Sequence, residues 1–252
     1  GELSIIPNGA VLIEGEAIAE VGDSADLLSR YPNEERYDAS GHSVLPGFVD
    51  PHTHLVWAGD RAAEFEMRLE GKTYMEIMSA GGGIQSTVNA TRGASNEDLV
   101  AQTSLRARDI FALGTTTAEA KSGYGLEWNS ELKQMEVLLE LDRQGPLEIQ
   151  PTFLAAHAIP ANFGDRPDAY VQQICTQMLP DLKSWWGQNA SGRPLPFVDV
   201  FCEKGAFSLE QTSLIFTTAR EMGFPLKVHA DEFKNLGGAR LAMPAMAAAM
   251  AA

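Results

Sequence analysis

The sequence predicts an α/β fold that begins with a small β module and continues as a TIM-type (β/α)8 barrel. Five short apolar segments alternate with helix-like segments, and capping patterns open two of the helices. A length of 252 residues would suit a whole barrel, which typically needs about 250 residues. Only five strand–helix units are found, so we expect the first part of a barrel.

The amino-terminal residues 1–43 are predicted to form the small β module, which we expect to be incomplete. Apolar runs alternate there with turn-forming residues such as Pro7, Asn8 and Gly9, a pattern typical of short antiparallel strands. The strand candidates cover residues 4–6, 10–13 and 17–21.

The barrel part is expected to cover residues 44–242. Ser95 and Ser208 each stand three residues before an acidic or amide side chain, the pattern of a capping box at a helix start. A long loop with its own small helix is expected between Asp50 and Ser95. Strands are predicted over residues 44–50, 115–121, 147–156, 196–202 and 225–229, with helices between them. Residues 243–252 contain only Met, Ala and Pro and are given no function.

The composition excludes several classes of protein. With 19 basic and 34 acidic side chains the formal net charge is −15, which excludes an electrostatic nucleic-acid binder. No apolar run reaches the length of about 18 residues that suggests a membrane span, so no membrane partner is expected. Cys175 and Cys202 lie in or beside apolar sequence, which indicates buried thiols in a reducing cytoplasm.

Four of the five histidines follow predicted strands. His52 and His54 come after the first strand, His157 after the third and His229 after the fifth. Because the carboxyl ends of parallel strands meet at one edge, and residues two apart in an extended chain face the same side, these imidazoles could bind one metal ion. The alternative is that they make hydrogen bonds in the core or in turns.

Other polar residues near the predicted strand ends allow two interpretations each. Glu232 could move protons next to a metal site, or could belong to a solvated acidic pair with Asp231. Arg61 or Arg68 could pair with a substrate carboxylate, or could form surface ion pairs with nearby glutamates. Tyr124 could reach the barrel mouth, or its glycine-rich surroundings could simply form a turn.

The stretch PGFVDPHTH at residues 46–54 resembles the metal-binding opening of the amidohydrolase superfamily. The surrounding sequence, from about residue 10 to residue 242, looks like the imidazolonepropionase family of that superfamily. The matching stretches are residues 52–61, 65–69, 80–92, 114–126, 153–160 and 228–238.

The resemblance implies metal-dependent hydrolysis of the cyclic amide of 4-imidazolone-5-propanoate to N-formimidoyl-L-glutamate, a reaction of histidine degradation. By matching position, His52, His54 and His229 would hold one zinc or iron ion, and imidazole nitrogen suits both metals. No organic cofactor is implied. Related enzymes suggest a homodimer.

The resemblance also implies the residues that meet the small, carboxylate-bearing substrate. They are Arg61, Tyr74, Tyr124, His157 and Glu232, with His157 and Glu232 as catalytic residues. The family has a further metal-ligating Asp and another catalytic His on later strands, which this sequence does not contain. We therefore expect that the 252-residue polypeptide alone cannot form a closed active barrel. The alternatives are another amidohydrolase, such as a heterocycle deaminase, and a non-catalytic fragment that binds a metal or ligand.

Overall fold

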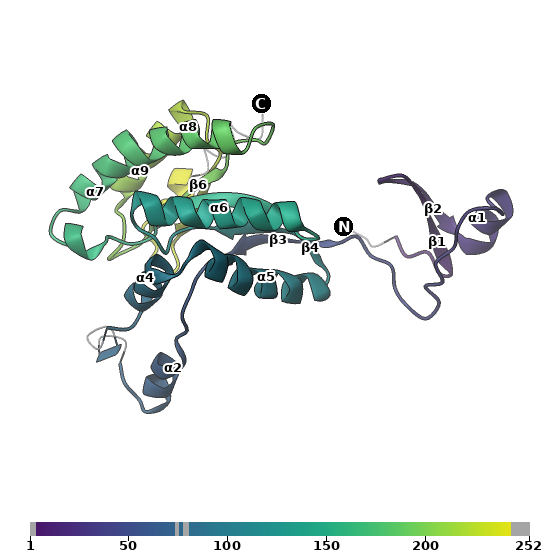
Figure 1. Ribbon diagram of the computed structural model, residues 1–252, viewed down its shortest axis with the longest axis horizontal. Helices are drawn as coiled ribbons and strands as arrows, with labels where there is room; N and C mark the ends of the chain where they lie inside the picture. Colours follow the sequence, from purple (N-terminus) through teal and green to yellow (C-terminus); the bar gives the residue numbers. More distant parts are fainter. Residues whose placement is uncertain (1–3, 74–75, 78–80, 243–252) are drawn as a thin grey trace. The chain divides into compact units, whose positions relative to one another are not determined.

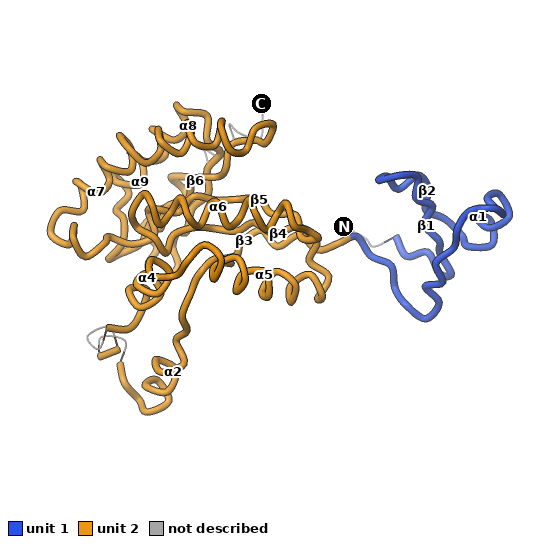
Figure 2. The backbone as a smooth tube through the Cα atoms, in the orientation of Figure 1, with its two compact units in different colours: residues 1–46 blue, residues 47–252 orange. Residues whose placement is uncertain are grey.

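The computed structural model describes residues 4–73, 76–77 and 81–242 (Figure 1). The chain divides into two compact units, Gly1–Pro46 and Gly47–Ala252, and each has its own sheet (Figure 2). Among the described residues, no helix combines the length and the apolar character needed to cross a membrane.

The first unit contains an antiparallel hairpin of β1 (Gly9–Glu14) and β2 (Ala17–Asp23), followed by α1 (Ser24–Arg30). The Asp23 side chain caps α1 by accepting hydrogen bonds from two backbone amides of its first turn. Two of the three predicted strands are confirmed. The strand predicted over residues 4–6 is wrong, because Ile5 and Ile6 are exposed and Pro7 follows, and no neighbouring strand pairs with them among the described residues.

The second unit is built on five parallel strands whose order in the sheet follows the order of the chain. This confirms the predicted first five strands of a TIM-type barrel. The strands are β3 (Phe48–Thr53), β4 (Thr115–Lys121), β5 (Glu148–Ala156), β6 (Phe197–Cys202) and β7 (Leu226–Ala230).

The first barrel strand begins later than its apolar sequence suggests. It was predicted over residues 44–50, but β3 starts at Phe48, whose amide donates to the Gly114 carbonyl oxygen at 2.8 Å. Pro46 has no backbone N–H to donate to a neighbouring strand. Gly47 lies so close to Thr116 that a β-carbon there would come within 2.1 Å of its hydroxyl oxygen.

Helices connect the strands and pack against the sheet (Figure 1). Ser95 and Ser208 cap the helices that follow them, and the Ser208 capping box is complete, with Gln211 reaching back to the Ser208 amide. The connecting helices are α5 (Asn96–Ala112), α6 (Trp128–Gln144), α7 (Pro167–Gln173), α8 (Leu179–Asn189) and α9 (Leu209–Glu221). A 3-10 turn, Ala161–Phe163, precedes α7, and a π-helical turn, Ile174–Met178, joins α7 to α8.

The long loop after β3 contains α2 (Ala62–Leu69) and α4 (Ile84–Gly93), so it holds more helix than the single short one predicted. The glycine run before α4 forms a turn, and Gly83 adopts a φ of 75° at its end. This turn is fixed by the buried Glu64 carboxylate, which accepts a hydrogen bond from the Gly83 amide at 2.8 Å.

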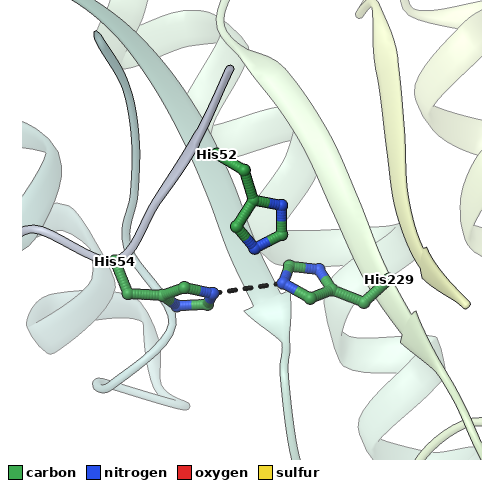
Figure 3. A group of neighbouring side chains, drawn as sticks. All are labelled: His52, His54 and His229. Carbon is green, nitrogen blue, oxygen red and sulfur yellow. Dashed lines mark hydrogen bonds between the residues drawn. The ribbon is translucent and has the colours of Figure 1, made fainter. Parts of the chain in front are cut away.

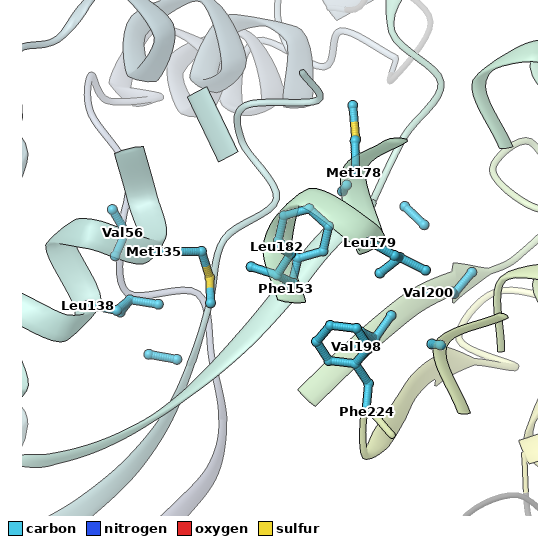
Figure 4. Close-up of a cluster of buried hydrophobic side chains, with 14 of the residues drawn as sticks. Val56, Met135, Leu138, Phe153, Met178, Leu179, Leu182, Val198, Val200 and Phe224 are labelled. Carbon is cyan, nitrogen blue, oxygen red and sulfur yellow. The ribbon is translucent and has the colours of Figure 1, made fainter. Parts of the chain in front are cut away.

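The hydrophobic core lies between the sheet and its covering helices (Figure 4). Phe153 and Val198 from the strands and Leu138 and Leu182 from the helices all belong to this core, and all four are buried. Both cysteines are buried free thiols, as predicted. The sheet is strongly curled, as a contact between its two end strands shows. The Lys227 ammonium group of β7 donates to the Pro51 carbonyl oxygen of β3 at 2.9 Å.

Candidate metal centre

Three histidines from the two ends of the sheet converge at its carboxyl edge. His52 lies in β3, His54 directly follows it, and His229 lies in β7. One ring nitrogen from each can be chosen so that all three lie within 4.8 Å of one another. The Nε2 atoms of His54 and His229 are 3.1 Å apart (Figure 3). The predicted meeting of these three imidazoles is therefore confirmed.

The surroundings favour the neutral form of two of these rings, those of His54 and His52. Burial, followed by the nearby charges of His157 and His229, lowers the pKa of His54 to about 3. Partial burial and the charge of Lys121 lower the pKa of His52 as well. A neutral imidazole offers the lone pair that a metal ion needs. The Nε2 atom of His54 is the ring nitrogen that faces His229.

A buried ionic network lies directly behind His229. Its Nδ1 is 2.9 Å from Asp199 Oδ2, and the same carboxylate oxygen is 3.2 Å from Lys121 Nζ. Lys121 also contacts the Glu119 carboxylate at 2.5 Å. Burial pushes the pKa of Asp199 upward, but His229 and Lys121 outweigh this effect and leave the pKa lowered.

Sequence reasoning missed this network, although a signal was present. Glu119 and Lys121 stand two apart in a predicted strand, so both face the same side, yet charged side chains were not expected inside the barrel. Glu119 also accepts a hydrogen bond from the Thr53 amide at 3.1 Å, which fixes the backbone between His52 and His54.

The segment after His54 has a second support. Arg106 of α5 donates through Nη1 to the carbonyl oxygens of Leu55 at 3.0 Å and of Trp57 at 2.9 Å. Its guanidinium carbon lies 3.5 Å from the centroid of the Trp57 ring, a cation–π contact. This helix residue therefore anchors the chain where it leaves the histidine pair.

His157 and Tyr124 lie beside the histidine cluster. The His157 ring centroid is 5.1 Å from that of His54, and the Tyr124 ring centroid is 5.3 Å from that of His157. Burial lowers the pKa of His157 to about 4 and raises the pKa of Tyr124. The Nδ1 of His157 lies 2.9 Å from the Gly123 carbonyl oxygen, and because a carbonyl oxygen only accepts, this nitrogen carries the proton.

Arg61 lies in the loop above this edge of the sheet. Its Nε donates to the Thr87 hydroxyl at 3.1 Å, and its charge acts on the pKa values of Tyr124 and His157. Arg61 also forms the alternative contact, an ion pair with Glu64, in which Arg61 Nε lies 3.9 Å from Glu64 Oε1.

The other two predicted site residues, Glu232 and Tyr74, say less about the site. Glu232 lies in the loop after β7 with an exposed side chain, and Tyr74 lies outside the described residues. The loop that carries Glu232 is held by the buried Glu203 carboxylate, whose Oε2 accepts from the Phe233 amide at 2.8 Å and the Lys234 amide at 3.2 Å. Sequence reasoning did not select Glu203.

Comparison with known proteins identifies relatives for the chain. It is 47% identical over 242 residues to the imidazolonepropionase of Herpetosiphon aurantiacus, covering 96% of this chain and 56% of the relative. It is also 47% identical over 244 residues to that of Chloroflexus aggregans, covering 96% of this chain and 57% of the relative. The chain thus spans little more than half the length of the curated relatives it matches.

A family model agrees with these matches, and a solved structure shares the fold. Residues 9–33 match the bacterial imidazolonepropionase-like composite domain. The chain superposes on the crystal structure of A. niger ochratoxinase with a TM-score of 0.52 at 16% identity, covering 95% of this chain and 54% of that one. At this identity the match shows a shared fold and nothing more. Along 96% of its own length the chain is therefore similar to imidazolonepropionases.

Proposed function

We propose that this protein hydrolyses the cyclic amide of 4-imidazolone-5-propanoate to N-formimidoyl-L-glutamate, using one zinc or iron ion held by His52, His54 and His229. The observation that carries the proposal is the convergence of three imidazoles at the carboxyl edge of the sheet. The names of the relatives supply the substrate.

The reaction adds one water molecule across the ring amide. The water oxygen bonds to the ring carbonyl carbon, the carbon–nitrogen bond breaks, and the leaving nitrogen receives a proton. A metal ion bound here would supply Lewis acidity toward the water and the carbonyl oxygen. Glu232 is proposed to carry protons between the water and the leaving nitrogen.

The other residues of the site would bind and orient the substrate. Arg61 offers a positive charge for the propanoate group, which matters in a chain whose net charge of −15 repels anions. Since Nδ1 of His157 donates to the Gly123 carbonyl, its Nε2 is an acceptor that can receive an N–H group of the substrate ring. Tyr124 lies close enough to His157 for its hydroxyl to contact the same ligand.

The proposal includes the cytoplasm as the compartment. Cys175 and Cys202 are both free thiols, which is the usual state of cysteine in a reducing environment.

Zinc content tests the metal site directly. We expect the wild-type protein to retain about one equivalent of zinc after dialysis, and His54→Ala and His229→Ala to lose it, because two imidazoles hold a metal ion far more weakly than three. His42→Ala is the matched control, since His42 is exposed and lies in the first unit. Unchanged zinc content in both site variants, measured by atomic emission, would contradict the assignment.

Turnover assays test the substrate. We expect the zinc-loaded site, when it is completed by the later barrel strands that the family carries, to open the ring of 4-imidazolone-5-propanoate and to release no ammonia from guanine or cytosine. Ring opening is followed by the loss of ultraviolet absorbance. Ammonia release without ring opening would support a heterocycle deaminase in place of this proposal. Zinc retention without turnover of any of the three compounds would instead support a metal-binding chain that lacks hydrolase activity.

A further inference from the structure

In the loop between β4 and α6, residues 122–126 are organised around a single buried carboxylate. Glu131, in the first turn of α6, is fully buried. Its Oε2 accepts from the Gly123 amide at 2.8 Å, and its Oε1 accepts from the amides of Gly125 at 2.8 Å and Leu126 at 2.7 Å. Three of the five backbone amides of residues 122–126 therefore point at one side chain.

This arrangement constrains the backbone of the loop. Leu126 has a φ of 54°, which costs free energy for a residue with a β-carbon. Gly125 packs so tightly on the start of α6 that a β-carbon there would lie 2.5 Å from the Glu131 amide nitrogen. The hydrogen bonds to Glu131 offset the cost of this conformation.

The Glu131 carboxyl is met by backbone groups and not by a cation. Burial is the largest influence and leaves the pKa of this carboxyl raised, although hydrogen bonds from Ser122 and the three loop amides act in the opposite direction. Within the described part of the chain, no Lys, Arg or His side chain forms an ion pair with Glu131. The carboxylate and the loop amides therefore depend on one another.

The opposite side of the same loop meets the proposed substrate site. The Gly123 carbonyl oxygen receives the Nδ1 proton of His157 at 2.9 Å. Gly123 has a φ of 115°, and a β-carbon there would lie 3.0 Å from His157 Nδ1. The next residue, Tyr124, has its amide hydrogen-bonded to Gln134 Oε1 at 3.2 Å.

We propose that Glu131 is a positioning residue. Through the backbone of residues 122–126 it fixes which ring nitrogen of His157 carries the proton and where Tyr124 lies. Only the consequence for substrate binding rests on the proposed function. The effect on His157 itself is a property of the chain without substrate.

Glu131→Gln tests the proposal, since the amide NH2 of glutamine would face backbone N–H donors and cannot accept from all of them. Glu140→Gln is the matched control, because it removes a carboxylate from the solvent-facing side of the same helix, where Glu140 pairs with Arg143. The state of His157 is measured by NMR of ¹⁵N-histidine-labelled, metal-free protein, with its signals assigned through His157→Gln.

We expect the wild-type protein and Glu140→Gln to show His157 protonated at Nδ1 only. Glu131→Gln should lose this signal in favour of the Nε2-protonated form or a mixture of both. A folded Glu131→Gln protein in which His157 keeps its Nδ1 proton would overturn the proposal. Because no turnover is measured, failure here is distinct from failure of the proposed function.

Amide hydrogen exchange in the wild-type protein decides the matter if Glu131→Gln does not fold. The amides of Gly123, Gly125 and Leu126 should exchange far more slowly than the amide of Gly59, an exposed loop glycine. Exchange of these three amides as fast as that of Gly59 would overturn the proposal without any variant.

Discussion

The buried Asp199 carboxylate contacts both a histidine of the candidate metal centre and a buried lysine. It lies 2.9 Å from His229 Nδ1 and 3.2 Å from Lys121 Nζ, so it links an imidazole of the candidate metal centre to a cation in the barrel interior. A carboxylate behind a histidine selects the ring nitrogen that stays free for a metal and raises its basicity. Asp199 is thus expected to support metal binding without touching the metal.

Replacing this carboxylate should weaken zinc binding. We expect Asp199→Asn to lower zinc affinity by about 10–100-fold, because His229 loses a charged neighbour that orients it. Competition with a fluorescent chelator measures the affinity, and Asp109→Asn, at an exposed position in α5, provides the control. Equal affinities for the wild-type protein and Asp199→Asn would show that Asp199 has only a structural role.

In this chain, local sequence signals end the helices and strands. The loops that follow two of the strands are held by acidic side chains. Glu131 holds the loop after β4, and Glu203 holds the loop after β7. Asp231 accepts from the Leu236 amide at 2.8 Å and the Gly237 amide at 3.0 Å in the same region. Part of the acidic excess of the sequence therefore stabilises the rim of the site.

The capping box of α9 should make a measurable contribution to stability. Ser208→Ala removes the acceptor for the Gln211 amide, and we expect the free energy of unfolding to fall by about 1 kcal/mol. Urea unfolding followed by circular dichroism gives this quantity. Ser213→Ala, inside the same helix, should leave stability unchanged or slightly raised, since alanine favours helix interiors. Equal loss in both variants would argue against a capping contribution.

Stability of the metal-free chain should depend on pH through its buried histidines. His157 binds a proton near pH 4 in the folded chain, whereas an unfolded histidine does so near pH 6.5. Between these values the unfolded chain binds more protons, so the free energy of unfolding falls as the pH is lowered. For one such group the decrease is at most about 1.4 kcal/mol per pH unit.

Urea unfolding at pH 7 and pH 5, in the presence of a chelator, checks this dependence. His157→Gln should lose less stability between the two pH values than the wild-type protein. His42→Gln should behave like the wild-type protein, because His42 is exposed. The interpretation would be wrong if all three proteins lost stability equally.

Much of the fold could be predicted because it depends on short-range signals. The β-branched run of β4 and the serine caps of α5 and α9 act through neighbours a few residues away, so they can be found in the sequence. The same signals gave a wrong prediction at the start of the first unit, where residues 4–6 have strand propensity but no paired strand among the described residues. They also did not predict α1, in which only Leu27 is buried.

The histidine site was predictable for a related reason. Parallel strands bring their carboxyl ends together, so the positions of His52, His54, His157 and His229 after strands were enough to predict that they meet. The lowered pKa values of His54 and His157 also follow from burial at that edge.

Only the tertiary structure decided which charged residues support the site. Whether Asp199 faces His229 or solvent depends on strand order, curl and register, which connect residues 30 apart along the chain. Glu131 and Glu203 likewise accept hydrogen bonds from backbone amides. Because residues of nearly every type carry a backbone amide, the sequence alone does not show which amides these carboxylates bind. Local propensity determines where strands and helices form, whereas the partners of a buried charge are set by the way distant strands pack, since only burial makes an unpaired charge costly.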